Sequence, residues 1–132
     1  MSNMKVETIN TASAFRAVDN VETVTLAVTT EETLAEALII ARNSSTGNAG
    51  FYARGGSDGL NEARFVLMSE DVVTADEVAA GTKSIRVMTA GEVRDDMIVT
   101  KAGDTIDYRE TDGLNGNNII CSSNHKISIP DL

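Results

Sequence analysis

The sequence has few of the side chains that usually carry chemistry. It contains one cysteine, one histidine, one proline and no tryptophan, and aromatic residues make up 4% of its 132 residues. A single cysteine excludes an internal disulfide framework. Cys121 and His125 are also too few to form a structural zinc site. Because aromatic residues are so few, we expect an aliphatic and rather thin core.

Long apolar runs and positive charge are also scarce. No segment approaches the roughly 18 apolar residues of a membrane span, and residues 1–10 lack the apolar run of a signal peptide. The chain has 20 acidic residues against 11 basic ones, which gives a net charge of −9. Proteins that bind nucleic acids concentrate positive charge instead. We therefore expect neither a membrane nor a nucleic acid as a direct partner.

Candidate catalytic and ligand-binding patterns are weak. Cys121 and His125 would lie on one face of an extended strand, but a nucleophilic pair also needs an orienting group. The glycine-rich segments Gly47–Gly59 and Gly81–Ser84 lack the register of a phosphate-binding loop. The acids of Asp107–Asp112 lack the spacing of a calcium loop, so we interpret this segment as a solvated loop. We expect no catalytic, cofactor-binding or metal-binding residue.

The sequence does contain short apolar segments separated by turn residues. In Val21–Thr30 the apolar residues alternate with small or polar ones, which is typical of a strand. The block Arg64–Met68 is apolar on both faces and follows an Asp-Gly turn, so it predicts a buried strand. Phe65 and Leu67 share one face of that strand, and we expect both to be buried.

Three further segments complete the predicted fold. Lys83–Val99 is a hairpin candidate with its turn at Ala90-Gly91, where Gly91 can take a positive φ. Ala75–Ala80 follows an acidic connection and predicts a short helical turn. Asn118–Ile129 closes the chain as one longer strand or two short ones, and Pro130 ends it because proline cannot extend a ladder inward.

Residues Thr30–Arg42 carry two conflicting signals. Thr29 followed by Glu32 fits a capping box, and apolar residues after it share a helical face. Against a helix, Ile39 and Ile40 are β-branched and a cluster of turn residues follows. Local propensity alone slightly favours a helix.

The N-terminal residues 1–20 are mostly polar and show no clean period, which is typical of a loose chain end. We therefore divide the chain into an arm, residues 1–20, and a β-rich domain, residues 21–132. The predicted fold class is mainly β: a small compact barrel-like or tulip-like domain with short helical turns and an extended N-terminal arm. We expect the arm to be disordered in the free protein and to bind a partner by strand addition, with Phe15 as its anchor.

Four segments follow one another in an informative order: VTLAVTTEETLAEALIIAR, GFYARGGSDGLNEARFVLMSEDV, GTKSIRVMTAGEVRDDMIV and NNIICSSNHKISI. Together they resemble the head decoration proteins of tailed phages, of the lambda type, over about Val21 to Ile129. The resemblance implies that Ala37–Arg42 is a strand, against the local helical signal. Members of this family often carry a helix before the last strand, which the polar and turn-rich residues 103–117 do not predict.

The resemblance implies a structural virion protein without catalytic chemistry. Such proteins bind the outer surface of the expanded icosahedral head, usually as homotrimers at three-fold positions, and hold the capsid against the outward pressure of packaged DNA. The implied partners are the major capsid protein and further copies of this chain, and the implied location is the outer surface of the virion. We expect the capsid-binding residues to be Phe15, Val18, Val21, Val24 and Leu26.

Two other functions stay open at this point. A β-rich tail-associated or adhesion module that binds a host surface would use the same strands and polar loops, and a low copy number per virion would identify it. A small enzyme would have to use Cys121 and His125, and Cys121→Ser would then abolish its activity.

Overall fold

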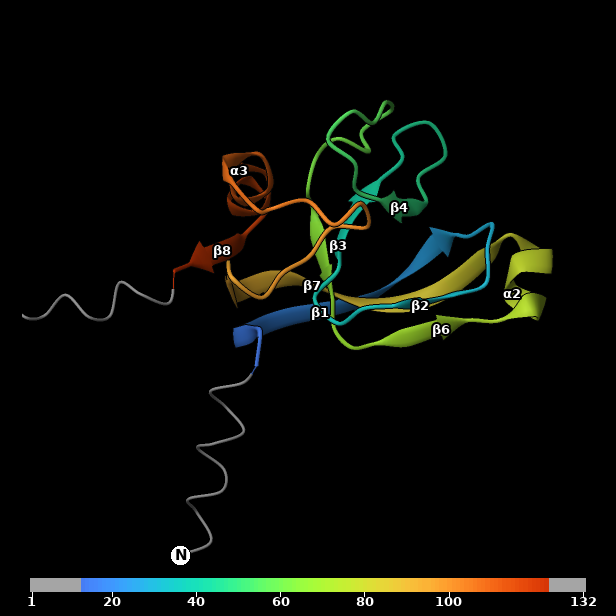
Figure 1. Ribbon diagram of the computed structural model, residues 1–132, viewed down its shortest axis with the longest axis horizontal. Coiled ribbons are helices and arrows are strands. Elements are labelled where there is room, and N and C mark those ends of the chain that lie inside the picture. Colours follow the sequence, from blue (N-terminus) through green and yellow to red (C-terminus); the bar gives the residue numbers. More distant parts are fainter. Residues whose placement is uncertain (1–12, 124–132) are drawn as a thin grey trace, which may run out of the picture.

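The computed structural model describes residues 13–123, so residues 1–12 of the expected arm, as well as His125 and Pro130, lie outside the described residues. Within residues 13–123 the protein is a small, mainly β domain with two short helices, which confirms the predicted fold class (Figure 1). The elements in chain order are β1 (Phe15–Ala27), β2 (Glu32–Leu34), β3 (Ile39–Arg42), β4 (Ala49–Phe51), β5 (Phe65–Leu67), β6 (Asp71–Val73), α2 (Ala75–Ala80), β7 (Thr82–Arg94), α3 (Tyr108–Gly116) and β8 (Ile119–Ser122).

Strands β1, β4, β3, β5 and β7 close into a ring. β1 pairs antiparallel with β7 along its whole length, and near its C-terminal end Leu26 also pairs with Ala49 of β4, in parallel. The pairings from β4 through β3 and β5 to β7 are all antiparallel and complete the circuit. β8 lies parallel to β7, and β2 and β6 form a separate two-stranded sheet.

The central strands are buried on both faces, as the apolar block around β5 predicts. Val66 packs into a cluster to which α3 contributes Leu114. Phe65 and Leu67 point to the opposite face, into a cluster built from all five strands of the ring. Their exposed fractions of 6% and 1% confirm the prediction that both are buried. The protein therefore has one core inside the ring and a second one outside it, under α3.

Strand β1 begins at Phe15 rather than at Val21. Phe15–Asn20, which we expected in the arm, are therefore part of the sheet and pair with β7 between Ala90 and Val93. Arg16 to Asn20 are all exposed. Because neither face of this segment is buried, its sequence needs no alternation of apolar and polar residues. Backbone pairing with the long strand β7 holds this segment in place. Such pairing does not depend on amino-acid composition, so the sequence does not reveal it.

The helix that local propensity favours over Thr30–Arg42 does not form. The segment contains β2 and β3, separated by a turn in which Ala37 takes a φ of 67°. Ile39 and Ile40 are completely buried and pair with β5. Long-range pairing of two β-branched residues outweighs the capping signal, so the strand that the resemblance implies is confirmed over Ile39–Arg42.

The predicted hairpin in Lys83–Val99 is wrong. β7 runs without a break through Ala90-Gly91, and the turn comes after Arg94. Gly91 does take a positive φ, of 150°, but it serves a different purpose there. The pairing register of β1 shifts next to Gly91, and a Cβ atom at this position would overlap the carbonyl oxygen of Ala17. Gly91 therefore permits a bulge and a close approach of β1.

The expected loop at Asp107–Asp112 is a helix instead. α3 begins after Asp107, whose side chain accepts a hydrogen bond from the Arg109 N–H, and Glu110 completes a capping box. The short helical turn expected at Ala75–Ala80 is confirmed as α2. A helix thus stands before β8, the last strand within residues 13–123, where the resemblance implies one.

Candidate binding surface

The five residues that we expected to bind the capsid all lie on β1, but their environments differ. Leu26 is completely buried inside the ring. Val24 and Phe15 each pack partly against a core cluster. Val21 is half-buried, and Val18 is 44% exposed. Leu26 therefore belongs to the core, and Val18 and Val21 are the side chains of this set that a partner can reach most easily.

One long edge of β1 carries no partner strand. β7 pairs with β1 from Phe15 to Ala27, whereas β4 reaches the other edge only at Leu26. Between Phe15 and Thr25, no strand within residues 13–123 pairs with that second edge. An unpaired edge presents a row of backbone N–H and C=O groups to which another chain can bind.

Hydrogen bonds on the far side of β7 identify the backbone groups that point outward from β1. The Met68 N–H donates to the Arg86 carbonyl, 3.0 Å away, so the polar groups of Arg86 face β5 rather than β1. Thr23 lies opposite Arg86 in the ladder. Because the two form a non-hydrogen-bonded pair, Thr23 directs its own N–H and C=O away from β7. The period of two gives Val21 the same direction.

The same argument holds nearer the start of the strand. The Gly91 N–H donates to the Asn118 carbonyl, 3.1 Å away, and so faces β8. Val18 lies opposite Gly91 and therefore also presents its backbone groups outward. We refer to the outward backbone groups of Val18, Val21 and Thr23 as the free edge of β1.

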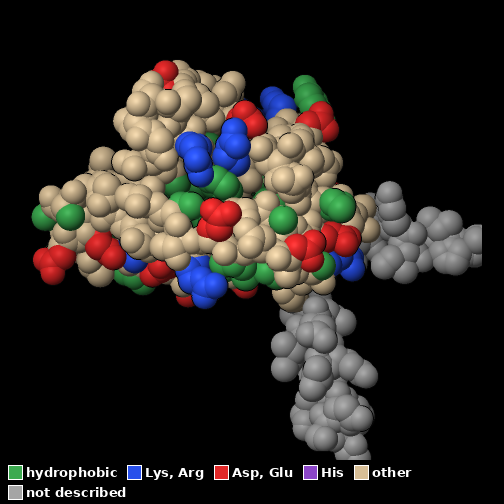
Figure 2. Space-filling model, turned by 180° about the vertical axis from the view of Figure 1, so that it is seen from behind, with side chains coloured by type: hydrophobic (Ala, Val, Ile, Leu, Met, Phe, Trp, Pro, Cys, Tyr) green, Lys and Arg blue, Asp and Glu red, His purple; other side chains and the backbone are tan. Residues whose placement is uncertain are grey.

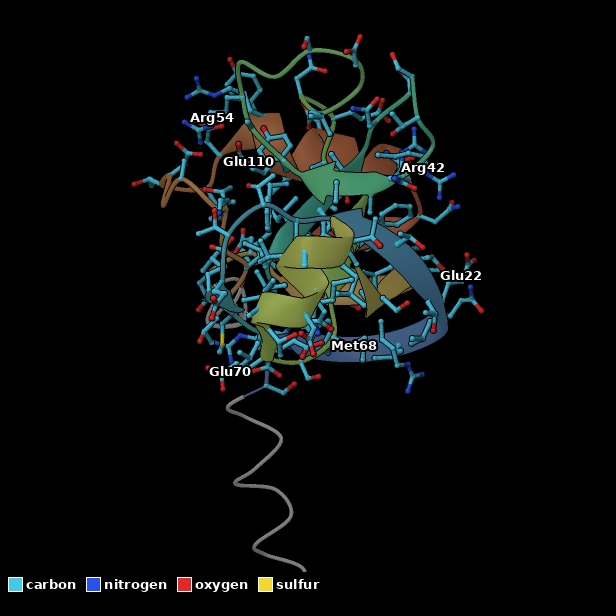
Figure 3. The ribbon with its side chains drawn as sticks, turned by 90° about the vertical axis from the view of Figure 1, so that its right-hand side faces the viewer. Glu22, Arg42, Arg54, Met68, Glu70 and Glu110 are labelled. Atoms are coloured by element: carbon cyan, nitrogen blue, oxygen red, sulfur yellow. The ribbon has the colours of Figure 1, made fainter. Side chains whose placement is uncertain are left out.

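A polar pocket of about 220 Å³ opens beside this strand. It lies beside the part of β1 that precedes the pairing of Leu26 with β4. Residues from β1, β3, β5, β7, the connection before β5 and the connection after α3 surround it. Figure 2 shows this face, on which basic side chains gather at a hollow. Figure 3 shows Arg42 and Glu22 pointing towards the same side of the molecule. We call it the arginine pocket; it is lined by Glu22, Arg42, Arg64, Phe65, Thr89, Asn117 and Asn118.

The two arginines of this pocket have few partners within their own chain. The Arg42 guanidinium lies over the Phe65 ring, 5.3 Å from its centre, and no described carboxylate lies within ion-pair distance of it. Arg64 donates to the Asn117 side-chain oxygen at 3.2 Å and has one long contact, 3.5 Å, with Glu62. Both guanidinium groups therefore keep donors that another acceptor can use.

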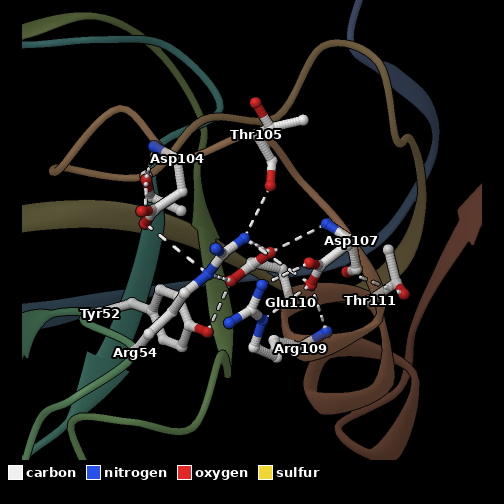
Figure 4. A network of polar contacts seen from close by, with 9 residues as sticks. Tyr52, Arg54, Asp104, Thr105, Asp107, Arg109, Glu110 and Thr111 are labelled. Carbon is white, nitrogen blue, oxygen red and sulfur yellow. Dashed lines mark hydrogen bonds and ion pairs between the residues drawn. The ribbon is translucent and has the colours of Figure 1, made fainter.

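A second arginine cluster has the opposite character (Figure 4). Glu110 of α3 is completely buried. It accepts two hydrogen bonds from Arg54, both 2.8 Å long, and one from the Tyr52 hydroxyl at 2.7 Å. The Asp107 N–H donates to it as well, at 3.0 Å. We call these residues the Glu110 network; it fastens α3 to the segment that follows β4.

The Glu110 network fixes the charge of its members at neutral pH. Burial acts to raise the pKa of Glu110, but the hydrogen bonds from Arg54, Asp107 and Tyr52 outweigh it and lower the pKa to about 2. Burial and the bond to Glu110 raise the pKa of Tyr52 to about 12. Acid–base catalysis works best with a pKa near the operating pH. The arrangement is therefore suited to holding the helix in place rather than to proton transfer.

The remaining chemical candidates offer little. Burial raises the pKa of the Cys121 thiol to about 12, and a protonated thiol is a poor nucleophile. His125, its expected partner, lies outside the described residues, so the pair stays untested. In the part of the chain that the structure describes, no three His, Cys, Asp or Glu side chains come together in a metal-binding arrangement. Neither helix there has the length and apolar character needed to cross a membrane.

Sequence reasoning missed both arginine clusters. Arg42 ends β3 and Arg64 precedes β5, so no local motif in the sequence predicts that they line one pocket. Asp107 and Glu110 do form a D-x-x-E pattern, a capping signal that could have predicted α3. Comparison with known proteins adds no family to these observations, because no protein-family model and no curated protein matches the chain.

Proposed function

We propose that this protein decorates the outer surface of the expanded head of a tailed phage, as a homotrimer at three-fold positions, and stabilises the major capsid protein lattice against the pressure of packaged DNA. The sequence resemblance suggests the virion, the partner and the trimer. The observation that carries the proposal in the structure is the free edge of β1, which is the strand that holds all five expected contact residues.

The free edge suits strand addition by another protein. Val18, Val21 and Thr23 present backbone donors and acceptors in an extended conformation, so a partner segment can pair without unfolding any part of the ring. Val18 adds an exposed apolar side chain beside them. Asp19 and Glu22 are exposed on the same strand, and charged side chains on an edge discourage pairing between free copies of one protein. The edge is thus open to a specific partner.

The expected energies fit a multivalent protein better than a monomer. Each hydrogen bond contributes about 0.5–1.5 kcal/mol net, so a few outward groups bind weakly on their own. Linking three copies makes the second and third contacts intramolecular and raises avidity without new contacts. The net charge of −9 favours a solvated outer surface over contact with packaged DNA.

The experiment is co-sedimentation of the purified protein with expanded heads that lack decoration. We expect saturable binding at a high copy number per head and greater resistance of the decorated heads to heat or chelators. A failure to co-sediment would contradict the proposal, and a few copies bound per complete virion at the tail would favour the adhesion module.

A matched pair of proline variants tests the role of the edge. Thr23→Pro removes an N–H that points to solvent, which edge strands tolerate, and should leave a folded protein that binds heads weakly. Val24→Pro removes an N–H that faces β7 and should unfold the domain. Thr23→Pro binding as tightly as the wild type would show that this part of the edge is not used.

A further inference from the structure

We propose that the arginine pocket binds a carboxylate, and that the partner segment on the free edge of β1 is an extended peptide with an Asp or Glu at the position whose side chain enters this pocket. The inference rests on the proposed function for its partner and deepens it. The pocket itself is a site that can be tested without heads.

The donors of the pocket match a carboxylate. Guanidinium groups bind carboxylates through paired N–H groups in a planar fork. Arg42 has no acceptor in its own chain within the described residues, and Arg64 is held in position by Asn117 at 3.2 Å. The Thr89 hydroxyl accepts from the Asn20 side chain at 2.6 Å and can still donate its own proton.

The charge of the lining favours a single negative charge. Two guanidinium groups and the Glu22 carboxylate line the pocket and leave an excess of one positive charge in the lining. Glu62, outside the lining, lies 3.5 Å from Arg64 and offsets part of this excess. Glu22 accepts a hydrogen bond from Asn20 at 3.2 Å and makes no ion pair with a described residue. A phosphate dianion would meet Glu22 at close range with only that excess to balance it. A carboxylate, with a single negative charge, is the better match for this lining.

The position of the pocket connects it to the free edge. Glu22 lines the pocket and lies on β1 between Val21 and Thr23, whose backbone groups point outward. A strand that pairs with these two residues therefore passes the mouth of the pocket. Its side chains alternate between two faces, so one of them can be directed towards Arg42 and Arg64. Backbone pairing would supply affinity, and the pocket would select for an acidic residue at that place.

The first test uses sodium glutarate as a probe of the wild-type protein. The Nε–H signals of Arg42, Arg64 and Arg86 are followed by NMR during titration at constant ionic strength. Arg86 is exposed on β7 and does not line the pocket, so it serves as the internal control. We expect the Arg42 and Arg64 signals to shift and saturate in the millimolar range, which is typical of one carboxylate on two guanidinium groups, while Arg86 does not saturate. Equal behaviour of all three arginines, or tighter binding of inorganic phosphate than of glutarate, would overturn the proposal.

Two variants sharpen this result. Glu22→Gln removes the negative charge from the lining and should tighten glutarate binding several-fold. Arg42→Gln should abolish saturation of the Arg64 signal. If Glu22→Gln weakens binding, Glu22 positions the arginines instead and the assigned charge balance is wrong.

The second test uses expanded heads. Arg42→Gln should weaken head binding about tenfold or more, because a charge-assisted hydrogen bond is lost, whereas Arg86→Gln, with the same change in net charge, should not. Equal losses in both variants would contradict an acidic partner in the pocket. Absence of head binding by the wild type would overturn the proposed function, and the glutarate titration would still decide on the pocket.

Discussion

Arg54 and Arg42 lie on opposite sides of one domain and show two uses of the same side chain. Arg54 donates twice to the buried Glu110 and once to the Thr105 carbonyl, so three of its five N–H donors have acceptors inside the chain. Arg42 rests on an aromatic ring with no described carboxylate partner. Arg42 therefore keeps N–H donors that an acceptor from outside the described residues can use. The Glu110 network connects α3 to the segment after β4, and the arginine pocket is the proposed site for a carboxylate of a partner.

The largest expected effect separates the two arginine clusters by stability. Glu110→Ala leaves Arg54 and Tyr52 without their shared acceptor and should cost about 3–5 kcal/mol of unfolding free energy, as for a broken buried ion pair. Urea denaturation measures it, with the exposed acid Glu31→Ala as the control that should change little. If Glu110→Ala lowers the unfolding free energy as little as Glu31→Ala does, the Glu110 network does not stabilise the fold.

The next effect concerns the junction between β1 and β7. Gly91→Val adds a branched side chain where even a Cβ atom would overlap the Ala17 carbonyl, at a φ that L-residues rarely adopt. We expect a loss of about 1–3 kcal/mol from backbone strain and displacement of the first residues of β1. Thermal unfolding and head binding should both decline. A neutral Gly91→Val would mean that β1 does not approach β7 as closely as described.

Acid should weaken the Glu110 side of the molecule selectively. The pKa of Glu110 falls from 4.5 to about 2 on folding, so its stabilisation is present above pH 4.5 and is lost as the pH falls towards 2. Asp107, lowered from 3.8 to about 2 mainly by Arg109, acts in the lower part of this window. Unfolding free energy measured from pH 6 to pH 2 should therefore decline less steeply in Glu110→Gln than in the wild type. Parallel curves would show that Glu110 is not the titrating group.

The smallest effect on stability is expected on the free edge of β1. Val18→Asp replaces a 44% exposed side chain and should change the unfolding free energy by no more than about 0.5 kcal/mol. The same variant should bind heads weakly, because it removes the apolar contact beside the paired backbone. Normal head binding by a stable Val18→Asp would move the contact away from this part of β1.

The parts of the molecule that sequence predicts well are those with a local pattern. Alternation in Val21–Thr30, the doubly apolar block around Phe65 and the acidic start of α2 were read correctly. The prediction of a positive φ at Gly91 is confirmed, but the predicted turn is wrong. A bulge and a turn both favour glycine, so the residue alone does not distinguish them. Phe15–Asn20 show no hydrophobic pattern in the sequence. Their extended conformation depends on backbone pairing with β7, which does not require a particular side-chain pattern.

The candidate sites are less visible still. Arg42 and Arg64 come together because β3 and β5 are neighbours in the ring, a fact of topology that no local window contains. The sequence around Glu110 is typical of a solvated acid. Its burial depends on the contact with Arg54, which is far away in the sequence. The capping pattern that begins with Asp107 is visible in the sequence and predicts the start of α3. The burial of Glu110 in that helix is not visible there.

Hydrogen exchange of β1 amides, free and bound to expanded heads, tests most directly whether the free edge is the binding surface. In the free protein the outward N–H groups of Val18, Val21 and Thr23 should exchange fast, while the neighbouring amides that face β7 exchange slowly. On heads, the three fast amides should become protected. Tight head binding that leaves them exchanging as fast as in the free protein would contradict strand addition at this edge.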